Sequence, residues 1–197
     1  MHASPLHQSS PLTEHRLQTG RNIVNIVLVG FMGTGKTAVG IQLADMLRMK
    51  FTDTDDIIEE DSGMSISRIF SEMGEEHFRD LESEAVEKVC KLTRHVIATG
   101  GGAVIREQNL QNLRSTGMLF CLDATAEVIF ERTSEYNHRP LLQVEKPIGQ
   151  IRKMLRMREP FYSLADHRID TSQLTVNQVV DKIADLFKAH SSDPATD

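Results

Sequence analysis

The sequence predicts an α/β protein with three layers, in which helices cover both faces of a parallel sheet. Apolar segments typical of buried strands occur at 25–30 (NIVLVG) and 118–123 (MLFCLD), and a third at 95–102 (HVIATGGG) runs into glycines. Segments with the apolar periodicity of helices lie between and after them. A strand that is apolar at every position is buried on both faces, as in a parallel sheet between two helical layers.

The predicted helices follow from apolar residues that recur every three or four positions. Residues 36–49 form an amphipathic segment directly after the first strand. In 75–92 one face carries Phe78, Leu81, Ala85, Val89 and Leu92. In 176–187 the corresponding residues are Val176, Val179, Val180, Ile183 and Leu186. Each helix therefore has one side that can pack against the sheet.

The length and composition predict one domain. A chain of 197 residues, 40% of them hydrophobic, can bury one core and is too short for two ordinary domains. We place this domain at residues 21–190. The polar segment 1–20 is predicted to be a disordered extension, with a short organelle-targeting peptide as the alternative, and 191–197 a disordered tail. No apolar run reaches the length of a transmembrane helix.

Charge and cysteine content narrow the class of protein. The net charge of -6 argues against a general affinity for nucleic acid or anionic membranes. The two cysteines, Cys90 and Cys121, lie in separate apolar segments without metal-ligand spacing. We therefore predict that both are reduced residues of the core and that the protein is cytoplasmic.

The segment GFMGTGKT, residues 30–37, matches the pattern G-x-x-x-x-G-K-[ST] of a phosphate-binding loop (P-loop). It lies between a predicted strand and a predicted helix, which is where backbone N–H groups can face the phosphates of a nucleotide. The expected nucleotide-binding residues are Gly33, Thr34, Gly35, Lys36, Thr37 and Ala38. The alternative is a glycine-rich turn with an ordinary surface lysine.

The rest of the chain favours a small kinase among the proteins that use such a loop. The motifs D-x-x-G and N-K-x-D, which a GTPase needs, are absent from the sequence. An oligomeric ATPase motor normally needs a longer chain. A kinase of a small molecule fits the length and the motif.

Two aspartates, Asp53 and Asp55, lie two positions apart in FTDTDDIIEE, after a short apolar stretch and before a predicted helix. On a strand they would point the same way and repel each other unless a metal ion or a substrate lay beside them. The alternative is that the aspartates cap the helix, and a cap by Asp55 or Asp56 is compatible with a functional role.

Five motifs in the same order resemble those of the shikimate kinase family. They are GFMGTGKT (30–37), DTD (53–55), FRDLE (78–82), GGG (100–102) and RPLL (139–142), with REPFY (158–162) as a sixth. The resemblance extends from residue 25 to residue 187. It implies a P-loop kinase fold with a five-stranded parallel sheet and a lid at about 132–147. It also implies that ATP phosphorylates the 3-hydroxyl of shikimate in aromatic amino-acid biosynthesis, giving shikimate 3-phosphate and ADP.

The resemblance assigns roles on the nucleotide side. Thr37 and Asp53 are expected to hold Mg²⁺, the latter through water molecules. Arg132 is expected next to the adenine, and Arg139 at the phosphates when the lid closes over ATP. The residues with implied catalytic roles are Asp55, Lys36 and Arg139.

On the substrate side, Asp55 is expected to hydrogen-bond the accepting hydroxyl and take its proton. Arg79 and Arg158 would clamp the carboxylate, because guanidinium pairs with carboxylate in a planar fork. The substrate-binding residues implied are Asp55, Arg79, Glu82, Gly101, Gly102 and Arg158. The protein is expected to bind ATP and shikimate as its small-molecule partners. It is also expected to be a monomer.

The residue patterns alone also allow other interpretations of these sites and of the whole protein. Arg79 and Glu82, spaced i, i+3, also fit a surface ion pair, and 131–147 also fits a plain surface loop. Asp123 follows an apolar strand as the metal-binding aspartate of many P-loop proteins does, so it competes with Asp53 for Mg²⁺. The alternatives for the whole protein are another small-molecule kinase, such as one for gluconate, and a catalytically inactive nucleotide-binding regulator.

Overall fold

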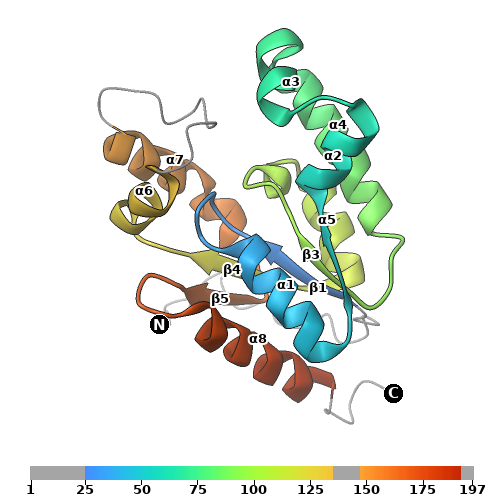
Figure 1. Ribbon diagram of the computed structural model, residues 1–197, viewed down its shortest axis with the longest axis vertical. Helices are drawn as coiled ribbons and strands as arrows, with labels where there is room; N and C mark the ends of the chain where they lie inside the picture. The colour runs from blue at the N-terminus through green and yellow to red at the C-terminus, as the bar shows by residue number, and fades with distance from the viewer. Residues whose placement is uncertain (1–24, 135–146, 192–197) are drawn as a thin grey trace, which may run out of the picture.

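The computed structural model describes residues 25–134 and 147–191, and in it helices lie on both faces of a five-stranded sheet (Figure 1). The elements in chain order are β1 (Asn25–Val29), α1 (Lys36–Leu47), β2 (Lys50–Asp53), α2 (Thr54–Ser62), α3 (Ile66–Glu72), α4 (Gly74–Val89), β3 (His95–Ala98), the 3-10 helix η1 (Ala103–Ile105), α5 (Glu107–Thr116), β4 (Gly117–Asp123), α6 (Ala126–Ser134), α7 (Pro147–Tyr162), β5 (His167–Asp170) and α8 (Val176–Ser191).

All strand pairs are parallel, and the strand order is β2-β3-β1-β4-β5. The central strand β1 pairs with β3 on one side, where Ile26 lies opposite Val96, and with β4 on the other, where Ile26 lies opposite Met118. Ligands bind outside the carboxyl ends of such a sheet, where successive connections leave in opposite directions. The predicted fold class, with its five parallel strands, is confirmed.

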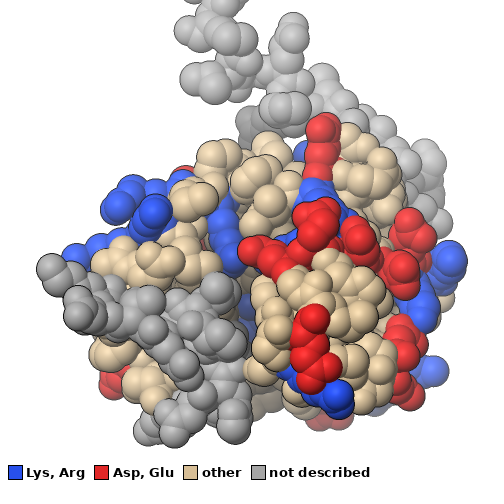
Figure 2. All heavy atoms as spheres, turned by 90° about the horizontal axis from the view of Figure 1, so that it is seen from above, with Lys and Arg blue, Asp and Glu red and all other residues tan. Residues whose placement is uncertain are grey.

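Helices α2, α3 and α4 form a small unit beside the sheet with its own apolar core. Buried Ile58, Ile69, Phe78 and Ala85 pack together there. Figure 2, which views this end of the molecule, shows Asp and Glu side chains gathered on its surface. The exposed acidic residues of these helices are Asp56, Glu59, Glu60, Asp61, Glu72, Glu75, Glu76, Asp80, Glu84 and Glu87.

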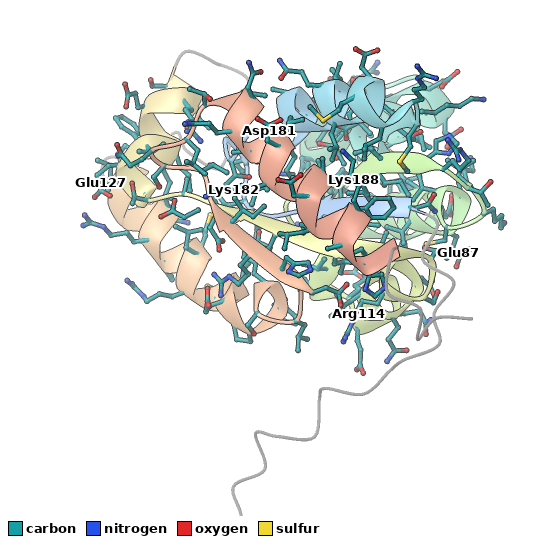
Figure 3. The ribbon with its side chains drawn as sticks, turned by 90° about the horizontal axis from the view of Figure 1, so that it is seen from below. Glu87, Arg114, Glu127, Asp181, Lys182 and Lys188 are labelled. Atoms are coloured by element: carbon teal, nitrogen blue, oxygen red, sulfur yellow. The ribbon has the colours of Figure 1, made fainter. Side chains whose placement is uncertain are left out.

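Helices α1 and α8 cover one face of the sheet. Val179 and Ile183 of α8 are buried against this face together with Leu43 of α1. The other side of α8 is exposed to solvent and carries Asp181 and Lys182 (Figure 3). Burial on one side of α8 therefore follows the periodicity expected from the sequence.

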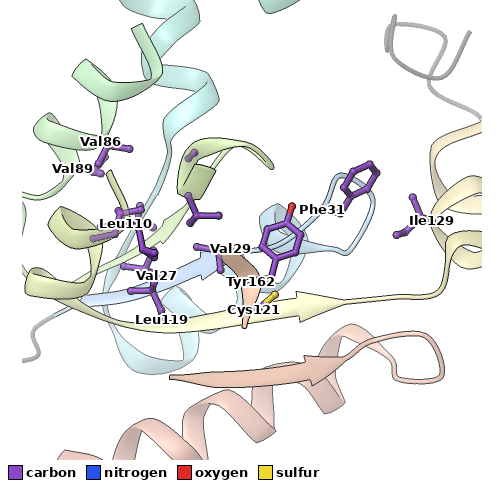
Figure 4. Packing of buried hydrophobic residues seen from close by; sticks show 14 of the residues in the cluster. Val27, Val29, Phe31, Val86, Val89, Leu110, Leu119, Cys121, Ile129 and Tyr162 are labelled. Atoms are coloured by element: carbon purple, nitrogen blue, oxygen red, sulfur yellow. The ribbon is translucent and has the colours of Figure 1, made fainter. Parts of the chain in front are cut away.

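Helices α4, α5, α6 and α7 pack against the opposite face. Val27 and Val29 of β1 lie in this core, next to Leu119 and Cys121, their register partners in β4 (Figure 4). Tyr162, the last residue of α7, is buried in the same core. Because successive strand residues point to opposite faces, β1 contributes alternately to both cores and is apolar almost throughout.

The structure adjusts several predicted boundaries. The strand predicted at 95–102 ends at Ala98, because the glycines after it leave the sheet and turn into η1. The helix predicted at 75–92 is α4, which ends at Val89, so Leu92 packs on the core from outside the helix. The helices predicted at 36–49 and 176–187 are α1 and α8.

The predicted extension (1–20), most of the tail (191–197) and most of the lid lie outside the described residues. Arg132 belongs to α6, and residue 147 begins α7. Arg139 lies outside the described part of the chain. In the part that is described, no helix is long and apolar enough to cross a membrane.

Both cysteines are free, as expected. Cys121 is fully buried and Cys90 is half-buried.

Candidate functional site

The P-loop connects the end of β1 to the start of α1, as the motif predicts. Gly30 has a φ of 133°, and a Cβ atom there would overlap the carbonyl oxygen of Leu122 in β4. Gly35, with a φ of 96°, precedes α1, and no side chain among the described residues caps this helix end. Positive φ favours glycine at both positions. The backbone N–H groups at the start of α1 can therefore serve a phosphate.

Lys36 folds back over this loop. Its ammonium nitrogen donates hydrogen bonds to the carbonyl oxygens of Gly30 and Phe31, both at 2.9 Å. The hydroxyl of Thr34 also donates to the carbonyl of Phe31, at 2.8 Å. The positive charge of Lys36 thus lies at the loop that would surround the phosphates.

Thr37 and Asp53 are brought together, although they are 16 residues apart. The hydroxyl of Thr37 donates to Oδ2 of Asp53 at 3.0 Å. Burial raises the pKa of the Asp53 carboxyl above its ordinary value, and hydrogen bonds from Asp55 and Thr37 oppose this rise. The two oxygens expected to hold a metal ion therefore lie next to each other.

Asp53 also caps α2, which corrects the expected geometry of the aspartate pair. Its Oδ1 accepts a hydrogen bond from the backbone N–H of Asp55 at 3.1 Å. The cap is therefore Asp53, not Asp55 or Asp56. The two carboxylates do not lie side by side on one strand, because β2 ends at Asp53 and Asp55 belongs to the first turn of the helix. Asp53 contacts the hydroxyl of Thr37, whereas Oδ1 of Asp55 lies near Gly100.

Asp123, the rival metal ligand, has other partners. It ends β4, and its Oδ2 accepts a hydrogen bond from Nε of Arg168 at 2.8 Å. Arg168 also pairs with Glu159 of α7. Oδ1 of Asp123 lies 3.5 Å from the thiol sulfur of Cys121. The charge of Asp123 is thus compensated within the protein, whereas Asp53 contacts the hydroxyl of the P-loop.

A second group of residues surrounds the turn of residues 100–102, hereafter the glycine turn. The backbone N–H of Gly100 donates to the hydroxyl of Thr54 at 3.0 Å. A Cβ atom on Gly100 would lie 2.7 Å from Oε1 of Glu82 and 2.9 Å from Oδ1 of Asp55. The absence of a side chain at Gly100 therefore lets carboxylates from α2 and α4 approach the same point.

Arg79 lies against the next part of the turn. A Cβ atom on Gly102 would overlap its guanidinium. Nη1 of Arg79 pairs with Oε2 of Glu82 at 2.7 Å, and Nη2 with Oε1 of Glu75 at 3.1 Å. The side chain of Glu82 is only 1% exposed, so this is a buried pair and not the surface pair that the spacing also allowed. Burial raises the pKa of the Glu82 carboxyl, and the charge of Arg79 opposes this rise.

Arg158 reaches the middle of the turn from α7. It is 8% exposed, and its Nη1 donates to the carbonyl oxygen of Gly101 at 3.1 Å. The hydroxyl of Tyr162 donates to the same oxygen at 2.7 Å. A Cβ atom on Gly101 would lie 3.4 Å from the backbone nitrogen of Met32 in the P-loop. The glycine turn is therefore where the two halves of the site meet.

Arg132 links α6 to the P-loop and to the loop after β5. Its Nη1 donates to the hydroxyl of Thr171 at 3.0 Å and its Nη2 to the carbonyl of Thr171 at 2.8 Å. Nη1 also lies 3.4 Å from the carbonyl oxygen of Gly33. The hydroxyl of Thr171 lies 3.2 Å from the carbonyl oxygen of Thr34. This network joins the P-loop to the loop after β5.

Sequence reasoning did not single out Thr171, Tyr162 or Arg106. Thr171 lies in IDTSQLT (169–175), a segment that the resemblance places at the end of the last strand beside the adenine, and no pattern marks one residue within it. Tyr162 belongs to a motif and reads there as an ordinary core residue. Arg106, which follows the glycine turn and η1, donates to the carbonyl of Arg79 at 3.0 Å and pairs with Asp80 at 2.8 Å. It fastens the segment after the turn to α4, and no local pattern signals that contact.

The structure thus gathers the predicted site residues that it describes, all except Arg139, into two adjoining groups, called the nucleotide group and the substrate group after the ligands that the resemblance implies. The nucleotide group holds Gly33, Thr34, Gly35, Lys36, Thr37, Ala38, Asp53 and Arg132. The substrate group holds Asp55, Arg79, Glu82, Gly101, Gly102 and Arg158.

Comparison with known proteins identifies the relatives of this chain. The family model described as shikimate kinase matches residues 32–188. The shikimate kinase of Thermodesulfovibrio yellowstonii is 50% identical over 168 residues, which are 85% of this chain and 97% of the relative. That of Caldanaerobacter subterraneus is 49% identical over 159 residues, 81% of this chain and 93% of the relative.

Solved structures agree with the sequence relatives. A shikimate kinase from Acinetobacter baumannii in complex with shikimate superposes with a TM-score of 0.83 at 36% identity, covering 88% of this chain and 97% of that one. Shikimate kinase from Aquifex aeolicus gives a TM-score of 0.72 at 31% identity, covering 86% of this chain and 99% of that one.

Proposed function

The chain belongs to the shikimate kinase family, and we propose on this premise that it transfers the terminal phosphoryl group of ATP to the 3-hydroxyl of shikimate. The products are shikimate 3-phosphate and ADP, in the biosynthesis of aromatic amino acids. The observation that carries the proposal is that Arg79, Arg158 and Asp55 meet at the glycine turn, directly beside the P-loop. Two guanidinium groups suit an acid, and a carboxylate beside a phosphate site suits an alcohol that accepts phosphate.

The acid end of shikimate would bind to Arg79 and Arg158. The two side chains come from α4 and α7 and both contact the glycine turn, so one carboxylate can lie between them. Glu82 keeps Arg79 in place through the 2.7 Å pair. Gly101 and Gly102 would contact the substrate through their backbone, and because they carry no side chains Arg158 and Arg79 can lie directly against the turn.

Asp55 would hydrogen-bond the 3-hydroxyl. As the oxygen of this hydroxyl forms its bond to phosphorus, the bond from the γ-phosphorus to the bridging oxygen breaks, and the hydroxyl proton passes to the Asp55 carboxylate. In a loose phosphoryl-transfer transition state the proton leaves late, so placement of the hydroxyl matters as much as basicity.

Nucleotide binding would involve the backbone of Gly33, Thr34, Gly35 and Ala38 with the ammonium of Lys36. Arg132 would border the adenine, which its contacts with Thr171, in the segment expected beside the adenine, support. Arg139, outside the described residues, is proposed to reach the phosphates.

The residues next to the P-loop fit a magnesium ion. Thr37 and Asp53 supply two neighbouring oxygens. Among the described residues, His, Cys, Asp and Glu side chains form no group of three that could hold a metal ion by themselves. Mg²⁺ keeps several water molecules and needs only one or two protein ligands beside the phosphates. When bound, it would neutralise charge on the β and γ phosphates. We propose that Thr37 and Asp53 hold it, the latter through water.

The Mg²⁺ concentration that turnover requires can show whether Asp53 or Asp123 holds the ion. In Asp53→Asn we expect the Mg²⁺ concentration for half-maximal turnover to rise about tenfold or more, because the weakly basic amide holds the hydrated ion poorly. Asp123→Asn is the matched control, and its requirement should stay within about twofold of the parent. The measurement is turnover against Mg²⁺ concentration at fixed ATP. If only Asp123→Asn changes the requirement, the assignment to Asp53 is wrong.

We also propose that the enzyme works as a monomer in the cytoplasm and without nucleic acid. Both thiols are free, and the net charge of the chain is -6. Free thiols fit the cytoplasm, which keeps cysteines reduced. A net negative charge disfavours binding to polyanions such as nucleic acid.

The test of the activity is ADP release with shikimate and with gluconate in parallel. We expect turnover with shikimate and none above background with gluconate. Turnover with gluconate alone would identify a different small-molecule kinase. ATP binding without turnover on either acid would identify a nucleotide-binding regulator.

A further inference from the structure

We propose that Phe31 is a positioning residue for the substrate carboxylate, because the face of its ring holds the guanidinium of Arg158 in place without neutralising its charge. The proposal rests on the proposed function, in which Arg158 binds the carboxylate of shikimate. It adds a residue of the P-loop itself to the machinery that selects an acid.

The geometry is that of a cation above an aromatic face. The guanidinium carbon of Arg158 lies 5.1 Å from the centroid of the Phe31 ring, within the range of about 6 Å in which such contacts attract. Phe31 is fully buried and Arg158 is 8% exposed. The contact is therefore largely desolvated, which is where it is strongest.

The other partners of Arg158 in the described part of the chain are also uncharged. Its Nη1 donates to the carbonyl oxygen of Gly101, and no described carboxylate forms an ion pair with it. Glu82 is near enough to feel its charge, but the ion pair of Glu82 is with Arg79. The described partners of Arg158 are the carbonyl of Gly101, the Phe31 ring and the hydroxyl of Tyr162, none of them charged, so its charge stays available for an incoming carboxylate.

Arg79 shows the opposite arrangement. It too lies over a ring, at 5.2 Å from the centroid of Phe78, but Glu82 and Glu75 both pair with it. Those carboxylates fix its position and compensate its charge. The two arginines of the proposed clamp are therefore held differently: among the described residues Arg79 has two carboxylate partners besides its ring, and Arg158 has a ring but no carboxylate partner.

Phe31 belongs to both halves of the site. Its carbonyl oxygen accepts hydrogen bonds from Lys36 and Thr34, and its ring faces Arg158. Phe31 and Tyr162 belong to the same core cluster (Figure 4), and the hydroxyl of Tyr162 donates to the same Gly101 carbonyl as Arg158. A change confined to the ring keeps the backbone carbonyl, so effects on acid binding can be separated from effects on nucleotide binding.

The test compares two replacements of the ring. Phe31→Leu removes it, and pentafluorophenylalanine placed at position 31 alone keeps a ring of similar size but inverts the charge distribution of its face. We expect both to raise the dissociation constant for shikimate about tenfold. ADP affinity should stay within about twofold. Calorimetry with shikimate and with ADP measures both constants, and melting curves report whether each variant is folded.

Two controls isolate the contact. Pentafluorophenylalanine at Phe120, a buried ring that stacks on His167 in the other core, should leave shikimate affinity unchanged. In an Arg158→Met background, fluorination at Phe31 should have no further effect, because the cation is gone. If the fluorinated ring binds shikimate as the parent does, whether or not Phe31→Leu is weaker, the ring only fills space and the proposal is wrong. If the parent itself does not bind or phosphorylate shikimate, the proposed function has failed instead.

Discussion

Replacing Asp55 with Asn is expected to lower kcat by about 10²- to 10⁴-fold, the range that a positioned general base contributes. An amide can still hydrogen-bond the accepting hydroxyl but cannot take its proton. Nucleotide affinity should remain, because Asp55 lies against Gly100 and Glu82 on the substrate side of the site. Single-turnover kinetics give the chemical step, and calorimetry with ADP and with shikimate gives the two dissociation constants separately, since KM need not equal Kd.

The matched control for this substitution is Asp56→Asn. Asp56 follows Asp55 in the first turn of α2 and is exposed, so its loss changes the charge of the helix by the same amount. We expect turnover within about twofold of the parent for a surface position of this kind. Lost ADP affinity with intact shikimate affinity in Asp55→Asn would mean that the roles of Asp53 and Asp55 are reversed.

Lysine at Arg79 or Arg158 is expected to raise the dissociation constant for shikimate about 10- to 100-fold. Lysine keeps the positive charge but loses the planar fork that can donate two parallel hydrogen bonds to a carboxylate. One hydrogen bond to a charged group contributes about 1.5–3 kcal/mol, which corresponds to this range. Calorimetric titration with shikimate measures the effect.

The two lysine variants should differ in thermal stability. Arg79→Lys also weakens the pair that compensates Glu82, a carboxylate that is 1% exposed, so we expect a lower Tm. Arg158 makes no such pair among the described residues, and Arg158→Lys should lose less stability. Arg152→Lys, on the exposed side of the same helix α7, is the control and should change neither quantity. Shikimate binding at parental strength in both clamp variants would rule out the carboxylate clamp.

The central strands could be predicted from the sequence because burial on both faces leaves a pattern. β1 and β4 are apolar at almost every position. The edge strands β2 and β5 (KFTD and HRID) are four residues long and each pairs on one side only. Edge strands of this kind carry polar residues, and their periodicity is too short to recognise. The number of strands therefore followed from the family resemblance and not from residue patterns.

The site could be predicted where a motif marks it. Lys36 and Thr37 were identified by the spacing of the P-loop, and Arg79 and Arg158 by the resemblance. Residues that act through contacts with distant segments were not recognisable. Phe31 reads as an apolar residue of a loop, and its ring meets Arg158 only because α7 packs beside the P-loop in the folded chain.

The crowding around the glycine turn limits how this enzyme could be redesigned for another acid. A side chain at Gly100 would displace the carboxylates of Asp55 and Glu82, and one at Gly102 would displace Arg79. A mutant library that randomises these two positions would therefore consist mostly of inactive proteins. The side chains that approach the turn from α2, α4 and α7 are the proposed base and carboxylate clamp themselves, so a change of substrate has to come from residues farther from the turn.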